Sequence, residues 1–135
     1  MKKLIYPACF YPWDDNSGYT VVVPDLKGCV TEGDSLENAI EMAIDAASGW
    51  ILDSIEDNKD IPSPSNIQNI ELEYKDGFST YIVLDIDEYE RTHSKKSVKK
   101  TLSIPNWLNT LAERENINFS KALQESLKNK LNLIK

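Results

Sequence analysis

Aspartate is the residue type with which this sequence could bind a catalytic metal ion. Five candidates lie at predicted turns and strand ends: Asp14, Asp15, Asp25, Asp85 and Asp87. A metal-dependent nuclease needs several such carboxylates to converge on one point. Aspartate is also common in turns for a structural reason, because its side chain accepts hydrogen bonds from the nearby backbone. The spacing predicts no metal site and no catalytic residue, but it leaves a stand-alone nuclease as an alternative function.

The other reactive side chains form no recognisable active-site motif. His93 is the only histidine, and its polar neighbours predict a surface position. The sequence contains no H-E-x-x-H, P-loop, G-x-S-x-G or G-x-G-x-x-G motif. Cys9 and Cys29 are too few for a disulfide framework, so we expect two buried thiols in a reducing cytoplasm. We therefore predict neither an enzyme nor a cofactor.

The stretch SVKKTLSIPNWL, residues 97–108, is basic although the whole chain carries a net charge of -7. If residues 98–105 form a strand, period two places Lys99, Thr101 and Ser103 on one face. The opposite face then carries the mostly apolar side chains of Val98, Lys100, Leu102 and Ile104. Cationic and hydroxyl side chains on one face of a two-stranded ribbon can reach base edges in the major groove of DNA. We predict that this face reads DNA bases.

Two short helices are predicted after this strand. Pro105 ends the strand and can begin a helix whose apolar side carries Trp107, Leu108 and Leu111. Asn118 is predicted to cap a second helix. Leucines recur every four residues along it, at Leu123, Leu127 and Leu131.

One strand and two helices in residues 98–135 bury too little apolar surface to fold alone. Pairing this strand with its twin in a second chain solves the problem, so we predict a homodimer and leave larger assemblies open. The N-terminus of the second helix, with Asn118, Ser120 and Lys121, is predicted to contact DNA phosphates. The pattern resembles the ribbon-helix-helix family of DNA-binding domains. A dimerisation module without a DNA ligand is an alternative.

Charge is distributed unevenly along the chain. Residues 98–135 contain seven basic and three acidic residues, a net charge of +4, whereas residues 1–97 contain eight basic and 19 acidic residues, a net charge of -11. This difference predicts an anionic partner for the C-terminal part and a cationic partner for the rest. No apolar run approaches the roughly 20 residues of a membrane span, and prolines interrupt the N-terminal apolar stretch, so we expect neither a membrane segment nor a signal peptide.

The N-terminal part predicts a β-β-β-α-β unit of class α+β, in which one long helix covers an antiparallel-rich sheet. The predicted elements are strands over 3–11, 19–24 and 29–31, a helix over 33–58, a strand over 79–87 and a short helical turn over 87–93. Pro7 predicts an edge or bulged position for the first strand. Asp34 is the expected N-cap of the long helix, with Glu37 three residues later.

The apolar side of the long helix is predicted from spacings of three and four residues. Its members are Leu36, Ile40, Ala43, Ile44, Ala47, Ile51 and Ile55. The predicted domains are residues 1–92 and 98–135, joined by a linker over 93–97.

Residues 18–43, preceded by YPACF at 6–10, follow the pattern G-Y-x-V-x-x-P-D-L-x-G-C-x-T-x-G-x-S-x-E-x-A. This pattern resembles the HicB antitoxin family, and with the C-terminal part the resemblance covers nearly the whole chain. It implies a partial RNase-H-like fold for residues 1–92, without an intact nuclease centre. It also implies that this part blocks the active site of a small, usually basic HicA-type toxin, which cleaves mRNA using a histidine.

In this family the C-terminal domain is either helix-turn-helix or ribbon-helix-helix, and the proline-terminated strand favours the second. The complex would then repress its own operon by binding operator DNA. Besides a nuclease, a regulator whose N-terminal part senses a small ligand is an alternative, and it would need a pocket between helix and sheet.

Overall fold

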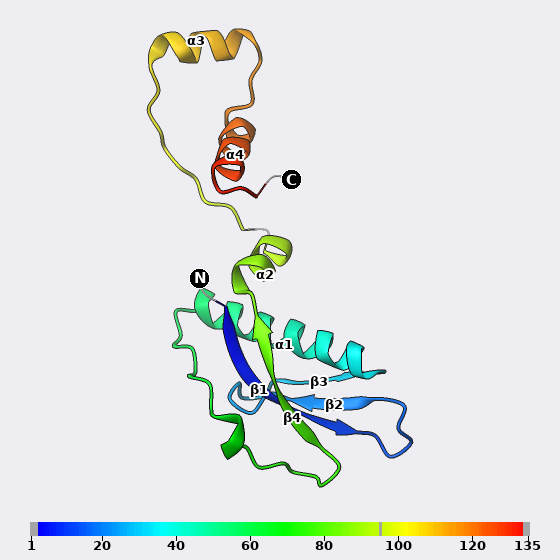
Figure 1. Ribbon diagram of the computed structural model, residues 1–135. Helices are drawn as coiled ribbons and strands as arrows, with labels where there is room; N and C mark the ends of the chain where they lie inside the picture. The colour runs from blue at the N-terminus through cyan, green and yellow to red at the C-terminus, as the bar shows by residue number, and fades with distance from the viewer. Residues whose placement is uncertain (1–2, 95, 134–135) are drawn as a thin grey trace. The chain divides into compact units, whose positions relative to one another are not determined.

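The computed structural model describes residues 3–94 and 96–133, which fall into two compact units (Figure 1). We call Met1–Lys95 the body and Lys96–Lys135 the C-terminal unit. The division between them lies inside the stretch predicted as a linker.

The body is built on a four-stranded sheet in which all neighbouring strands are antiparallel (Figure 1). The spatial order is β3-β2-β1-β4. The strands are β1 (Leu4–Pro12), β2 (Tyr19–Val22), β3 (Val30–Gly33) and β4 (Phe78–Leu84), and the body also contains the helices α1 (Leu36–Glu56) and α2 (Ile86–His93). The predicted β-β-β-α-β order is confirmed. The last strand is shorter than predicted because Asp85 caps α2, so the chain turns into a helix where the sequence pattern continued the strand.

The prediction that Pro7 places β1 at an edge is wrong for the strand as a whole, because β1 lies between β2 and β4. No bulge is present, since the register with β4 runs without interruption from Leu4 to Phe10. Pairing with β2, however, covers only Cys9–Pro12. Pro7 therefore lies where β1 has a strand neighbour on one side only, which a residue without an N–H group tolerates.

The N-cap of α1 is Ser35 and not Asp34 as predicted. The Ser35 Oγ accepts a hydrogen bond from the Asn38 N–H at 3.0 Å, and the Asn38 Oδ1 accepts one from the Asp34 N–H at 3.0 Å. These reciprocal bonds satisfy donors that a helix start leaves without an intrahelical partner. A capping side chain was thus predicted correctly for the start of α1, but one residue too early.

The core lies between α1 and one face of the sheet. Ala39, Ala43, Ala47 and Ile51 of α1 are all fully buried, whereas Leu36, predicted to belong to this side, is 41% exposed. The small alanines let the helix lie close to the strands. Gly33 shows how close, because a Cβ atom at this position would lie 2.4 Å from the Ala39 backbone nitrogen. A glycine is therefore required where β3 passes into α1.

The chain between α1 and β4, residues 57–77, is held against the rest of the body by side chains from several strands and loops. The Asp25 carboxylate accepts hydrogen bonds from the Ser65 N–H at 2.8 Å and from the Ser65 hydroxyl at 2.5 Å. The Tyr81 hydroxyl accepts from the Ile67 N–H at 2.9 Å, where a short 3-10 helix, η1 (Ile67–Asn69), begins. This segment, predicted only as a loop around residues 61–66, is thus an ordered part of the fold.

The C-terminal unit contains two helices, α3 (Asn106–Arg114) and α4 (Phe119–Lys130). Two residues after the last helical residue of each lies an asparagine with positive φ, Asn116 at 56° and Asn132 at 58°. The next residue closes each end, because the Ile117 N–H donates to the Ala112 carbonyl and the Leu133 N–H to the Lys128 carbonyl. This is the Schellman arrangement, which satisfies carbonyls at the helix end.

Candidate functional site

The residues predicted to read DNA bases are exposed. Lys99, Thr101 and Ser103 lie in a segment, Lys96–Pro105, that has no helix or strand within the single chain. A strand at this place needs a partner strand, and the prediction supplies it from a second copy, which the structure of one chain does not contain. The ribbon and its base-facing side chains therefore stay predictions.

The residues predicted to contact phosphates lie at the start of α4, as expected. The Asn118 Oδ1 accepts a hydrogen bond from the Lys121 N–H at 3.0 Å, which confirms the predicted N-cap. The Lys121 N–H is thus used by the cap in the single chain, and the phosphate contacts stay predictions. The Ser120 hydroxyl accepts from the Gln124 side chain at 3.2 Å, while the Lys121 side chain is exposed.

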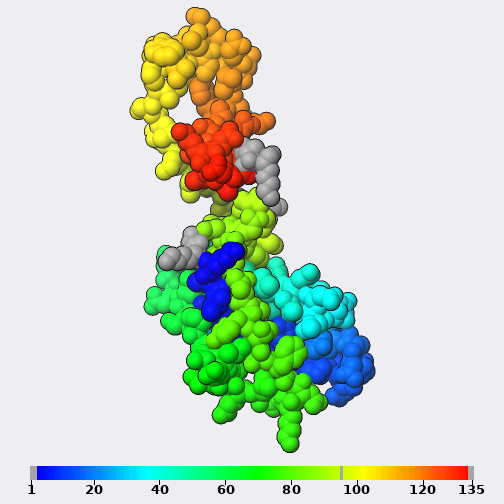
Figure 2. Space-filling view, in the orientation of Figure 1, coloured from blue at the N-terminus to red at the C-terminus, as the bar shows by residue number. Residues whose placement is uncertain are grey.

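The apolar side chains of the C-terminal unit are exposed in the single chain. Among its described residues, 96–133, none is buried, and only Asn109, Ala112 and Leu123 are partly buried. Large apolar residues that are at least 43% exposed are Val98, Leu102, Ile104, Trp107, Leu108, Leu111, Ile117, Phe119, Leu127, Leu131 and Leu133. Figure 2 shows the C-terminal unit, in yellow to red, with open space between its segments.

Three of the five aspartates considered for metal binding, Asp15, Asp25 and Asp85, have structural partners. Asp25 holds Ser65, and the Asp85 Oδ1 accepts from the Glu88 N–H at 3.1 Å as the cap of α2. Asp15 accepts from the Ser17 N–H and hydroxyl, and these bonds lower the pKa of its carboxyl. Among the described residues, no group of three His, Cys, Asp or Glu side chains could hold a metal ion. The nuclease alternative thus lacks its carboxylate cluster in this part of the chain.

The outer side of α1 is acidic. Glu37, Glu41, Asp45, Asp53 and Glu56 are exposed, and α1 contains no lysine or arginine. At the C-terminal end of this helix lies a hollow of about 280 Å³, lined by Trp50, Asp53, Ser54, Asp57, Lys59 and Asp60. Part of the negative charge of the body thus lies on the exposed side of α1, which suits a cationic partner.

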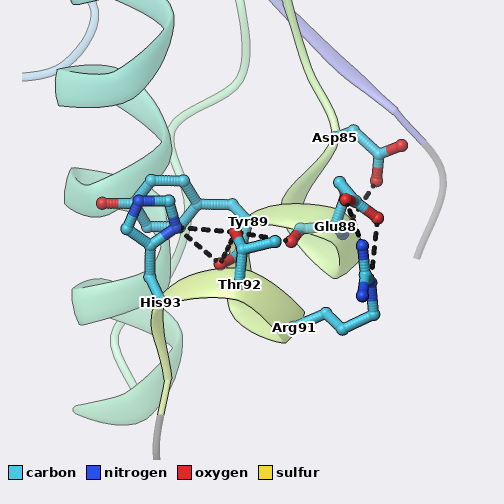
Figure 3. A network of polar contacts seen from close by, with 6 residues as sticks. All are labelled: Asp85, Glu88, Tyr89, Arg91, Thr92 and His93. Carbon is cyan, nitrogen blue, oxygen red and sulfur yellow. Dashed lines mark hydrogen bonds and ion pairs between the residues drawn. The ribbon is translucent and has the colours of Figure 1, made fainter.

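Helix α2 ends the body with a polar network around His93 (Figure 3). The His93 ring stacks on the Tyr89 ring at a centroid distance of 3.9 Å, and its Nδ1 lies 3.0 Å from the Tyr89 carbonyl oxygen. The His93 Nε2 is 3.8 Å from Asp45 of α1, and Arg91 pairs with Glu88 at 2.6 Å. His93 is exposed, as predicted, and its contacts join α2 to α1.

Both cysteines are free and buried, as predicted, and burial raises the pKa of each thiol. The space between α1 and the sheet, where a ligand-sensing regulator would need a pocket, is occupied by fully buried core side chains such as Ala43 and Phe10. In the described part of the chain, no helix is both long and apolar enough to span a membrane.

The model of a protein family, the HicB-like antitoxin of bacterial toxin–antitoxin systems, matches residues 6–126. The chain belongs to this family. It is 33% identical over 105 residues to a 14.9 kDa protein from the rep-hol intergenic region of Haemophilus phage HP1, a match covering 76% of this chain and 74% of that protein. It is 37% identical over 67 residues to antitoxin HicB 1 of Photorhabdus laumondii, which covers 50% of this chain and 43% of that antitoxin.

Solved structures from toxin–antitoxin systems have the same mixed α+β fold. A toxin–antitoxin complex from Streptococcus pneumoniae contains a chain that is 28% identical, with a TM-score of 0.62, covering 96% of this chain and 99% of that one. The antitoxin HicB of Burkholderia pseudomallei is 22% identical with a TM-score of 0.55, covering 98% and 99% of the two chains. At 22% identity, the similarity to the Burkholderia pseudomallei antitoxin concerns the fold alone.

Sequence reasoning missed the residues that hold the crossover segment, residues 57–77 between α1 and β4. Tyr6, Tyr11 and Tyr81 each use their hydroxyl on a backbone group of residues 62–73. Asp25 was considered only as a candidate metal ligand, and its hydrogen-bond partner Ser65 lies 40 residues away. No local pattern signals such a pair.

Proposed function

We propose that this protein is an antitoxin whose body binds a HicA-type toxin and blocks its active site. Membership of the HicB-like antitoxin family carries this proposal. The similar chain from Streptococcus pneumoniae belongs to a toxin–antitoxin complex. The exposed acidic side of α1 and the net charge of -11 over residues 1–97 suit a small basic toxin. In this proposal neutralisation is steric, the body has a partial RNase-H-like fold, and the protein is cytoplasmic, without enzyme activity of its own.

We further propose that the C-terminal unit is a ribbon-helix-helix domain that represses the protein's own operon. Two copies pair through residues 98–104, Lys99, Thr101 and Ser103 face the bases, and Lys121 with the start of α4 lies near the phosphates. The exposed apolar side chains of α3 and α4 and the net charge of +4 support a dimer that binds an anion.

Operator binding is tested by fluorescence anisotropy on DNA from upstream of the gene and on scrambled DNA, at several salt concentrations. The variant Lys99→Ala/Thr101→Ala/Ser103→Ala removes the proposed base contacts. Because good base contacts contribute about 1–3 kcal/mol each, the variant is expected to lose about 100-fold or more in affinity. A matched control, Lys75→Ala/Ser63→Ala, removes exposed side chains of the same kinds from the body and should bind like the wild type. Equal wild-type affinity for both DNAs would contradict the repressor role.

Toxin neutralisation is tested with a purified HicA-type toxin encoded beside this gene, in an mRNA-cleavage assay. Stoichiometric amounts of the chain should stop cleavage, and the triple DNA-binding variant should inhibit equally well because its changes lie outside the body. Cleavage at the full rate in excess antitoxin would refute the proposed function of the body.

A further inference from the structure

The hollow of about 280 Å³ at the C-terminal end of α1 forms where the chain turns out of this helix. Asn58 has a positive φ of 57°, and the Lys59 N–H donates to the Ser54 carbonyl at 2.8 Å, so the chain folds back over the last turn. This turn brings Asp57, Lys59 and Asp60 into one lining with side chains of the helix itself. The hollow therefore has walls from α1 and from the segment that follows it.

The lining of this hollow carries an excess of negative charge. Three carboxylates, those of Asp53, Asp57 and Asp60, belong to it, against the single ammonium group of Lys59. These four residues are exposed, and Lys59 forms no ion pair with any residue that the structure describes. The last turn of α1 contains no basic residue, so the partial negative charge of the helix end adds to that of the carboxylates. The hollow therefore favours a cation.

The lining also contains an aromatic ring and a hydroxyl group. Trp50 is partly buried, and its indole N–H donates to the Lys27 carbonyl at 3.0 Å, which fixes the ring in place. An indole attracts a cation that lies over its face. Ser54 is only 8% exposed, yet its hydroxyl has no hydrogen-bond partner among residues 3–94 and 96–133. A ligand in the hollow can therefore contact the ring and donate to this hydroxyl oxygen as well as to the carboxylates.

An arginine side chain is the cation that matches this lining. A metal ion does not, because no group of three His, Cys, Asp or Glu side chains in the described part of the chain could hold one. A volume of about 280 Å³ lies at the lower end of the roughly 300–1,000 Å³ of pockets for small molecules, so one long side chain suits it better. The planar guanidinium stacks on aromatic rings and has five N–H donors for carboxylates and hydroxyls, whereas a lysine ammonium is a compact point charge.

We propose that this hollow binds the side chain of an arginine on a cationic protein partner. The guanidinium lies over the Trp50 ring, and the three carboxylates of the lining and the Ser54 hydroxyl accept its hydrogen bonds. The excess of acidic residues in the body attracts such a partner at longer range. The identity of the partner rests on the proposed function, in which a basic HicA-type toxin supplies the arginine.

The hollow is tested without a partner protein by NMR on the isotope-labelled full chain. The probe is the peptide acetyl-Gly-Arg-Gly-amide, added to about 20 mM because a single side chain binds weakly. The indole N–H signal of Trp50, assigned by comparison with Trp50→Phe, should shift and saturate. The matched peptide with citrulline, which has nearly the same shape without the charge, should leave this signal in place, and a lysine peptide should shift it less.

Removal of the carboxylates provides the second test. The hollow variant is Asp53→Asn/Asp57→Asn/Asp60→Asn, and its control is Glu71→Gln/Glu73→Gln/Asp76→Asn, which removes the same charge from exposed positions before β4. The hollow variant should lose the response to the arginine peptide, and its affinity for the purified toxin should fall about tenfold, because up to three ion pairs with one guanidinium are lost. The control should bind peptide and toxin like the wild type. Both variants should keep the urea midpoint of the body, since all six side chains are exposed.

A Trp50 signal that stays in place with the arginine peptide, or that shifts equally with citrulline or lysine, would overturn the inference. Equal toxin affinities of the hollow variant and its control would also overturn it, because the toxin would then respond to net charge or to neither site. The peptide titration needs no toxin. A chain that binds the arginine peptide in the hollow but neither binds nor inhibits the toxin would therefore refute the proposed function while supporting an arginine site for another basic partner.

Discussion

Asp25→Ala removes the carboxylate that fastens the crossover segment, residues 57–77, to the body. Asp25 follows β2, and both of its oxygens accept hydrogen bonds from Ser65, 40 residues further along the chain. Residues 60–66, around Ser65, belong to no helix or strand. In the variant, two donors on Ser65 lose their acceptor, and the segment loses its link to the end of β2.

The expected loss follows from the kind of bond. Hydrogen bonds to a charged group contribute about 1.5–3 kcal/mol each when well shielded, and both residues here are only partly buried. We therefore expect Asp25→Ala to lower the free energy of unfolding of the body by about 2–3 kcal/mol. Ser65→Ala removes only the hydroxyl bond and should cost about 1 kcal/mol. The double variant should cost little more than Asp25→Ala, which is a coupling of about 1 kcal/mol.

The assay is urea unfolding of the full chain with Trp107→Phe, so that the signal comes from Trp13 and Trp50 of the body. The four chains of the double-mutant cycle are compared at equal concentration and pH. Asp14→Ala is the matched control, because it removes an exposed aspartate of the first turn and should change stability by less than about 0.5 kcal/mol. If Asp25→Ala is as stable as this control, or if the two changes are simply additive, then the Asp25–Ser65 contact does not hold the segment.

Three further predictions concern the body. Gly33→Ala should destabilise it by about 2 kcal/mol or more, because the new Cβ would lie 2.4 Å from the Ala39 nitrogen; an unchanged urea midpoint would refute this close approach. Asn58→Gly should stabilise the body by about 0.5 kcal/mol, because Asn58 has a φ of 57°, which glycine adopts at no steric cost. Asn58 follows α1, and the N–H of its neighbour Lys59 closes a Schellman arrangement there. A loss of stability in thermal unfolding would contradict this prediction. Burial raises the pKa of Cys9, Cys29 and Tyr6 in the folded state. Unfolding at high pH therefore releases protons, so the free energy of unfolding should fall as the pH rises above about 9. Equal urea midpoints at pH 7 and pH 10 would refute this.

Local signals in the sequence were sufficient where a structure depends on neighbouring residues. The strands follow from period-two patterns and β-branched residues, and α1 and α4 follow from apolar spacing and a capping side chain at each start. Asn118 is the clearest case, since its cap on Lys121 involves residues only three apart. The shift from Asp34 to Ser35 has the same origin, because two adjacent polar residues offer nearly equivalent caps.

Tertiary structure decided what depends on residues far apart. It placed β1 in the centre of the sheet despite Pro7, because β4 returns along its free side from more than 60 residues away. It also turned Asp25 from a candidate metal ligand into the acceptor of Ser65. The sequence by itself determined the family, the order of elements and the separation of acidic and basic parts, because these are written in local pattern and composition. Only the packed structure revealed which side chains make up the core of the body and which ones hold residues 57–77 in place, because burial and long-range contacts depend on which surfaces meet in space.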